Sequence, residues 1–178
     1  MSLTEVLHWS KMQITGDPGL AGNVNISELI CEILPLFQHS LQEKNIHLQN
    51  SIDTSVAAYG YADHLKLIFR NLLSNAIKFS HIGGNIYLSA NKERDKISIS
   101  ITDEGTGIKP AILEALQNEQ LRFTSTPGTA MEKGTGLGLM LVREFLDKNG
   151  GSLIIQNGPL KGSIFTVVLP KAPIVPME

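Results

Sequence analysis

The sequence predicts an α+β fold, a two-layer α/β sandwich in which one mixed sheet is covered by three helices. Three stretches repeat their apolar residues at helical intervals, and five shorter runs have the alternation or β-branched content of strands. Most of these strands follow one another as hairpins, without the regular strand–helix–strand order of a doubly wound dinucleotide fold. The 178 residues, 42% of them hydrophobic, are enough to bury one core, so we expect a single unit.

The first half of the chain is expected to hold two long helices with a short strand between them. The first helix spans residues 24–46, with Asn25 or Ser27 as its N-cap. Asn25 stands three residues before Glu28, as in a capping box, and Pro35 should kink or divide the helix. A strand is expected at residues 47–52, and the second helix runs from about residue 63 to 79.

The second half is expected to hold four strands and the third helix. Strands at 85–90 and 96–103 alternate in hydrophobicity, so that Ile97, Ile99 and Ile101 point to one face. The third helix covers 137–151 and should end at its closing glycines, before strands at 151–157 and 162–170. The glycine-rich region 103–139 is long for a loop, which indicates function, and only residues 110–117 in it have a helical pattern.

Composition excludes several classes of protein. The formal net charge of −2 does not favour a nucleic acid partner, and no apolar run reaches the roughly 18 to 20 residues of a membrane span. The N-terminus lacks the pattern of a signal peptide, so we expect a cytoplasmic location without membrane contact by this segment. The one cysteine, Cys31, is expected to be a small buried hydrophobe.

The helix 63–79 carries a narrow polar stripe. Asn71, Asn75 and Lys78 are spaced i, i+4 and i+7, along the seam between its apolar and polar faces. Amide groups at such a seam reach a ligand that lies across the edge of the core. Taken singly, each of the three is equally well explained as an ordinary surface residue.

An acidic residue ends the strand 96–103. The period of two places Asp103 on the same inward face as Ile97 to Ile101, where a carboxylate is costly unless a donor binds it. An adenine amino group is such a donor. Gly105 and Gly107 follow, and without a Cβ they let the backbone approach a flat ligand closely. A turn capped by Asp103 is the simpler alternative for this pattern alone.

The third pattern, GTGLGL, places Gly134, Gly136 and Gly138 just before a helix. It fits neither the dinucleotide pattern GxGxxG nor a Walker loop, which needs a Gly-Lys-Ser/Thr. The first N–H groups and the dipole of the following helix favour an anion, so backbone amides are expected to hold phosphates. A glycine-rich hinge is the alternative. Together, the three patterns meet the needs of ATP with Mg²⁺.

Four motifs in this order, NLLSNAIKF, DEGTGI, RFTST and GTGLGL, resemble the N, G1, F and G2 boxes of the catalytic ATP-binding domain of sensor histidine kinases. That domain belongs to the wider GHKL ATPase superfamily of gyrase, heat-shock chaperones and MutL. The resemblance covers about residues 24–170 and implies an α/β sandwich with ATP between the N-box helix and a flexible lid, here roughly residues 104–135.

The resemblance implies a role for each matching residue. Asn75 would ligate Mg²⁺ with Asn71 assisting, Lys78 would lie near the phosphates, and Asp103 would accept the adenine amino proton. The full set expected to contact the nucleotide is Asn71, Asn75, Lys78, Phe79, Asp103, Gly105, Gly107, Ile108, Phe123, Thr124, Gly134, Thr135, Gly136, Leu137 and Gly138.

Position 71 favours a kinase over a hydrolase. Hydrolytic relatives carry a glutamate four residues before the metal-binding asparagine, where it activates water; here that residue is Asn71. Transfer to an imidazole needs no such base, because the neutral nitrogen attacks unaided while the protein positions phosphate and metal. A non-catalytic nucleotide-sensing module, a serine kinase of the anti-sigma type and a hydrolytic relative remain the alternatives.

The sequence departs from the family pattern at three points. Glu104 replaces a frequent asparagine, and Ile164 replaces a frequent threonine, although Ser163 is adjacent. The acceptor motif, a histidine followed by glutamate and proline, is absent, and the five histidines are expected to be structural or surface residues.

The resemblance also divides the chain. Residues 1–14 are expected to be the end of a dimerisation helix, 15–170 the catalytic domain, and 171–178 a tail. The partners it implies are the dimerisation and histidine phosphotransfer domain of the same parent protein and a downstream response regulator.

Overall fold

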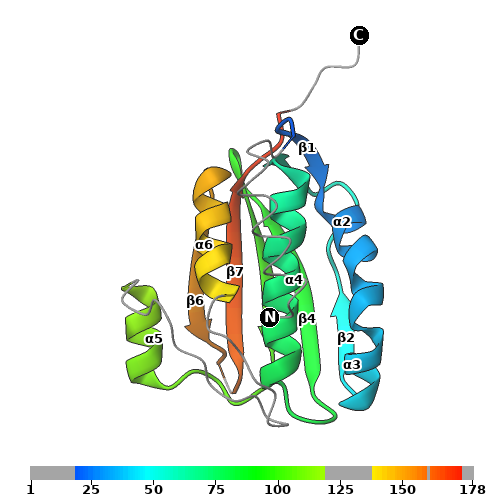
Figure 1. Ribbon diagram of the computed structural model, residues 1–178, viewed down its shortest axis with the longest axis vertical. Helices are drawn as coiled ribbons and strands as arrows, with labels where there is room; N and C mark the ends of the chain where they lie inside the picture. Colours follow the sequence, from blue (N-terminus) through cyan, green and yellow to red (C-terminus); the bar gives the residue numbers. More distant parts are fainter. Residues whose placement is uncertain (1–18, 119–137, 160, 174–178) are drawn as a thin grey trace.

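The computed structural model describes residues 19–118, 138–159 and 161–173, and its main layer is a five-stranded mixed sheet of order β2-β4-β5-β7-β6. Strand β2 runs parallel to β4, and all other neighbours in this sheet are antiparallel. Figure 1 shows the helices α2, α4 and α6 in front of this sheet, which confirms the predicted sandwich. The strands are β2 (His47–Asn50), β4 (Asn85–Lys92), β5 (Lys96–Asp103), β6 (Ser152–Asn157) and β7 (Ser163–Pro170).

A second sheet was not predicted. Strands β1 (Gly22–Asn25) and β3 (Ala57–Gly60) form a separate antiparallel pair beside the start of α2. Each strand has only four residues, GNVN and AAYG, which is too short a run to show the alternation that identifies a strand in sequence. The expectation of one sheet was therefore wrong.

The first predicted helix is divided into three pieces, α2 (Ile26–Ile33), the 3₁₀ turn η1 (Leu34–Phe37) and α3 (Gln38–Glu43). Pro35 lies in η1, as its missing N–H predicts. The N-cap is Asn25, whose side chain accepts the Glu28 N–H at 3.1 Å, while its own amide donates to the Glu28 carboxylate at 3.4 Å. The N-cap is confirmed, but the Glu28 carboxylate accepts from the side-chain amide of Asn25 and not from its backbone N–H, as it would in a capping box.

The remaining helices are α4 (Ala62–Phe79), α5 (Pro110–Gln117) and α6 (Gly138–Lys148). Helix α6 ends two residues before the predicted glycines, which instead form its cap. Gly150 has φ +64°, and the N–H groups of Gly150 and Gly151 donate to Asp147 and Leu146 at 3.1 and 2.8 Å. This is a Schellman motif, in which glycine stands just beyond the helix.

The core lies between the sheet and the helices. Ile97, Ile99 and Ile101 of β5 are fully buried, as the alternation predicted. The matching face of α4 is also buried, except that Phe79 is only half-buried. The buried apolar residues of α4 are Leu65, Ile68, Phe69, Leu72, Leu73, Ala76 and Ile77.

Cys31 is exposed, so the prediction of a buried cysteine was wrong. It follows the buried Ile30 by one residue, and the 100° turn per residue rotates its side chain away from the core toward the exposed Glu32. None of the described helices combines the length and hydrophobicity that crossing a membrane requires.

Candidate functional site

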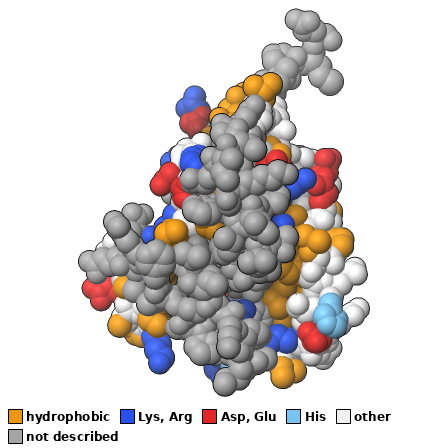
Figure 2. All heavy atoms as spheres, viewed as in Figure 1, with side chains coloured by type: hydrophobic (Ala, Val, Ile, Leu, Met, Phe, Trp, Pro, Cys, Tyr) orange, Lys and Arg blue, Asp and Glu red, His pale blue; other side chains and the backbone are white. Residues whose placement is uncertain are grey.

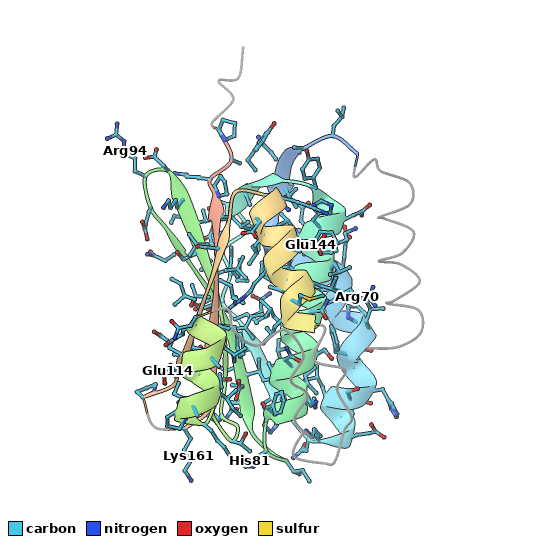
Figure 3. All side chains as sticks on the ribbon, turned by 60° about the vertical axis from the view of Figure 1, so that its left-hand side comes forward. Arg70, His81, Arg94, Glu114, Glu144 and Lys161 are labelled. Atoms are coloured by element: carbon cyan, nitrogen blue, oxygen red, sulfur yellow. The ribbon has the colours of Figure 1, made fainter. Side chains whose placement is uncertain are left out.

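Two predicted site residues, Asp103 and Phe79, meet a residue outside the predicted set, Ser163, at one end of the sheet. Asp103 is the last residue of β5, Phe79 the last of α4, and Ser163 the first of β7. Figure 3 shows His81 and Lys161, which lie just beyond α4 and just before β7, at this end, and Arg94 of the β4–β5 turn at the opposite end. Segments far apart in sequence are therefore brought together here.

Asp103 faces inward as predicted, and only 1% of its surface is exposed. Its Oδ1 accepts the N–H groups of Gly105 at 2.9 Å and Ser163 at 3.3 Å, and its Oδ2 accepts the Ser163 hydroxyl at 2.5 Å. Burial raises the pKa of Asp103, while the hydrogen bonds from Ser163 and Gly105 act in the opposite direction. The result is a buried acceptor group held in one orientation.

Ser163, the neighbour of the departure at Ile164, supplies a hydroxyl group to Asp103. Alternation along β7 buries Ser163 against Asp103 and leaves Ile164 half-buried on the opposite face. The buried acid therefore has a hydroxyl partner even though position 164 is apolar. The strand register, which the sequence does not show, pairs Thr102 with Ile164 and so places Ser163 beside the end of β5.

Gly162 is a second residue that sequence reasoning missed. Its φ is +80°, and a Cβ built on it would lie 1.7 Å from the Asp103 carbonyl oxygen. No other residue fits this position without moving the backbone of β5.

The two glycines that follow Asp103 are also required by the backbone. A Cβ on Gly105 would lie 2.0 Å from the Phe79 carbonyl oxygen, and Gly107 has φ +68°. Thr106 donates its N–H to that same carbonyl at 3.2 Å, so the G1 segment is bound to the end of α4. The close approach at Gly105 is to protein backbone, whereas the sequence argument assigned it to a flat ligand.

Asn157, at the end of β6, holds the other side of the G1 segment. Its Oδ1 accepts the Ile108 N–H at 2.7 Å, and its Nδ2 donates to the Ile108 carbonyl at 2.9 Å. The side-chain amide thus pairs with Ile108 as a strand would. The sequence did not indicate this role, because an asparagine before a Gly-Pro turn is expected there for its turn geometry alone.

The polar stripe of α4 lies where it was predicted, with Asn71, Asn75 and Lys78 all half-buried. The Asn71 amide donates to the Leu67 carbonyl at 2.9 Å, and its Oδ1 would lie 2.9 Å from a Cβ on Gly138. The N-box helix and the start of α6 are therefore in close contact. The Lys78 ammonium lies over the Phe79 ring, 4.9 Å from its centroid.

A family model described as histidine kinase-, DNA gyrase B-, and HSP90-like ATPase matches residues 60–173, well over half of the chain. The chain belongs to this ATPase family. The match includes Asn71, Asn75, Asp103 and both glycines of the G1 segment.

Individual relatives place the chain beside the histidine kinases of this ATPase family. It is 32% identical over 154 residues to the histidine protein kinase SaeS of Staphylococcus aureus, covering 85% of this chain and 44% of SaeS. The catalytic domain of histidine kinase ThkA superposes with a TM-score of 0.74 at 26% identity, over 86% of this chain and 97% of that domain. ThkA in a complex with the response regulator protein TrrA matches with a TM-score of 0.68 at 25% identity, over 86% of this chain and 42% of ThkA. The chain thus spans less than half the length of SaeS.

Several predicted site residues lie outside the described part of the structure. These are Phe123, Thr124, Gly134, Thr135, Gly136 and Leu137. Residues 1–14, assigned from sequence to a dimerisation helix, and most of the tail 171–178 lie outside it as well. Of the second glycine-rich motif, the structure therefore describes only Gly138 and the residue after it.

The described residues fit the nucleotide and metal that an ATPase of this family uses. A Cβ on Gly138 would lie 2.9 Å from the end of the Asn71 side chain, so the two residues are close neighbours, and within the described chain the Asn75 side chain makes no hydrogen bond. Among the same residues, no three His, Cys, Asp or Glu side chains cluster as a metal site. A hard cation here would depend on carboxamide oxygens and on phosphate oxygens of the ligand.

Two further observations bear on the predictions. Glu104 is exposed, and its pKa is lowered mainly by a hydrogen bond from Asn85 at 2.7 Å, so this departure leaves Asp103 undisturbed.

On the face in Figure 2, the described Lys, Arg, Asp and Glu side chains are interspersed rather than gathered by sign, which gives no support to nucleic acid binding.

Proposed function

We propose that this chain is the catalytic ATP-binding domain of a sensor histidine kinase, which binds ATP with Mg²⁺ and transfers the γ-phosphoryl group to a histidine on a separate dimerisation domain. The observation that carries the proposal is the buried Asp103 carboxylate, which begins the G1 segment (residues 103–108) and accepts the Ser163 hydroxyl. The asparagine at position 71 of α4 favours a kinase over a hydrolase.

The base of the nucleotide is recognised by Asp103. The Ser163 hydroxyl and two backbone N–H groups fix its carboxylate as an acceptor, and the amino group of adenine supplies a further donor. Ile108, whose backbone N–H is bound by Asn157, ends the same G1 segment. Because the carboxylate is buried, an unsatisfied ligand group facing it is strongly disfavoured, which provides selectivity for adenine.

The phosphates are held between α4 and the start of α6. Asn75 and Asn71 present carboxamide oxygens from one side of α4, Lys78 adds a positive charge from its last turn, and Gly138 begins α6 beside the Asn71 side chain. When bound, Mg²⁺ neutralises the phosphate charge that develops during transfer. The role of these residues is to position the phosphates, because little covalent chemistry is required of the protein.

Asn71 decides the acceptor. A carboxamide cannot take a proton from water, so hydrolysis is not assisted at this position. The neutral nitrogen of an imidazole attacks the γ-phosphorus directly, the bond to the β-phosphate oxygen breaks, ADP leaves, and the imidazole proton passes to solvent. The phosphohistidine then donates its phosphoryl group to an aspartate of a response regulator. The complex of ThkA with the response regulator TrrA supports that class of partner.

The test is a transfer assay with separately purified components. The chain, γ-labelled ATP and Mg²⁺ are mixed with the dimerisation domain of the parent protein, and label on its histidine is followed. We expect label to appear with the native chain and to be lost with Asn75→Ala. Nucleotide binding without transfer would contradict the proposal in favour of a nucleotide-sensing module. Label on serine would indicate an anti-sigma-type kinase, and free phosphate alone a hydrolase.

A further inference from the structure

A buried lysine outside the predicted site contacts the end of the N-box helix. Lys44, the residue just beyond α3, is only 6% exposed. Lysine is almost never fully buried without partners, because removing its charge from water is costly. Its ammonium group donates to the carbonyl oxygens of Ile77 at 2.9 Å, Lys78 at 2.9 Å and Ser80 at 3.3 Å.

These bonds complete the C-terminal end of α4. The last four carbonyl groups of a helix have no partner within it. Here the Ala76 carbonyl accepts the Ser80 N–H at 3.0 Å, and the Phe79 carbonyl accepts the Thr106 N–H at 3.2 Å. The two carbonyls between them, of Ile77 and Lys78, are bound by Lys44. A positive charge at this end also matches the helix dipole.

Lys44 is itself held from both directions. Its backbone N–H donates to Ser40 at 3.3 Å, and its carbonyl accepts the Gly83 N–H at 2.8 Å. The backbone of Lys44 is therefore held in place, and its ammonium group holds the last turn of α4. That turn carries Lys78 and Phe79 of the proposed nucleotide site, and the Phe79 carbonyl pairs with the G1 segment.

We propose that Lys44 is a positioning residue of the nucleotide site. It caps α4 from outside the helix and so keeps the Phe79 carbonyl in register with Gly105 and Thr106, beside Asp103. The inference rests on the proposed function for its effect on ATP, but its structural part is independent of any ligand. Lys44 does not contact the reacting atoms; it acts through the end of α4.

The experiment compares Lys44→Met with Lys66→Met. Both substitutions remove an ammonium group: Lys44 contacts the C-terminal end of α4, whereas Lys66 lies on α4 near its start. Lys66 pairs with Glu32 at 2.6 Å, and its side chain is 40% exposed. Backbone hydrogen exchange is measured without nucleotide at Ser80 and Thr106, with the central strand β5 as internal reference. ATP binding is measured by calorimetry.

For Lys44→Met we expect exchange at Ser80 and Thr106 to accelerate on the order of tenfold relative to β5, since the three carbonyls of Ile77, Lys78 and Ser80 lose the ammonium donor. ATP affinity should fall on the order of tenfold, and Lys66→Met should change neither quantity. Exchange that rises equally in β5 would overturn the inference, because Lys44 would then stabilise the fold as a whole. Unchanged exchange at Ser80 and Thr106 would overturn it too, because Lys44 would then not hold the end of α4.

Two further outcomes are separable. If the native chain binds no ATP, the proposed function fails, while the exchange data still decide the role of Lys44. If Lys44→Met does not fold, Lys44→Gln is measured in the same way, because its amide keeps two N–H donors and should give an intermediate exchange rate at Thr106.

Discussion

Replacing Gly162 by alanine should be among the most damaging single substitutions at the site. Gly162 has φ +80°, and a Cβ there would lie 1.7 Å from the Asp103 carbonyl oxygen and 2.9 Å from the Gly105 nitrogen. The two segments would have to separate by about 1.3 Å before the first contact reached 3.0 Å, the shortest distance that real Cβ atoms show. Both neighbours are backbone atoms, so no side chain can rotate away to relieve the contact.

Gly83 provides a matched control. Its φ of +75° is close to that of Gly162, but no atom lies within 4 Å of its Cβ position. Alanine at either residue incurs the left-handed backbone cost of roughly 1–2 kcal/mol. Only Gly162→Ala adds the overpacking cost, typically about 1–3 kcal/mol. The expected loss in the free energy of unfolding is therefore about 2–5 kcal/mol for Gly162→Ala and about 1–2 kcal/mol for Gly83→Ala.

Equilibrium urea unfolding of the three proteins measures these values, provided that the slope against urea stays constant so that the midpoints report stability. If Gly162→Ala were no less stable than Gly83→Ala, the close packing of Gly162 on Asp103 would be refuted.

Three further predictions concern single side chains. Asn25→Ala removes the N-cap of α2 and should lower the free energy of unfolding by about 1 kcal/mol in urea, whereas alanine at the exposed Asn91 should have almost no effect. Ser163→Ala removes the hydroxyl donor to Asp103; we expect a loss of about 1.5–3 kcal/mol and a higher pKa for Asp103 by NMR, and an unchanged pKa would count against the hydrogen bond. Burial, with Lys148 acting in the same direction, lowers the pKa of His64 below its ordinary value of about 6.5. Just below that pH, His64 is therefore protonated in the unfolded chain but still neutral in the folded chain. Stability should therefore fall as the pH drops below about 6.5, less steeply in His64→Gln, and equal slopes in the two proteins would show that His64 is not responsible.

Elements with strong periodicity were predictable from the sequence. Helix α4 and strands β4, β5 and β7 carry apolar residues at the helical or strand period, and their buried faces follow directly. The N-cap at Asn25 and the break at Pro35 rest on local chemistry that tertiary contacts do not override. The inward direction of Asp103 followed from the same alternation as Ile97 to Ile101.

What the sequence did not indicate depends on contacts between distant segments. Strands β1 and β3 are stable as a pair only where α2 and the end of β7 lie beside them, and Ala58 bridges to Lys171. Gly162 must be glycine because the backbone of Asp103, far away in the sequence, packs against it, so that a Cβ on Gly162 would lie 1.7 Å from the Asp103 carbonyl oxygen. Lys44 and Asn157 act on backbone groups of other elements, so no local pattern marks them.

The central claim is that the buried Asp103 carboxylate recognises the amino group of adenine, and calorimetric titration tests it most directly. The native chain is titrated with ATP and with purine riboside triphosphate, which lacks only that amino group, in the presence and absence of Mg²⁺; Asp103→Asn is titrated with ATP. A lost hydrogen bond to a buried charged group predicts binding of the analogue weaker by about ten- to a hundredfold. We predict no detectable ATP binding by Asp103→Asn, with unfolding in urea as the control for its fold. Equal affinity of the native chain for both nucleotides, or native-like binding of ATP by Asp103→Asn, would contradict the account.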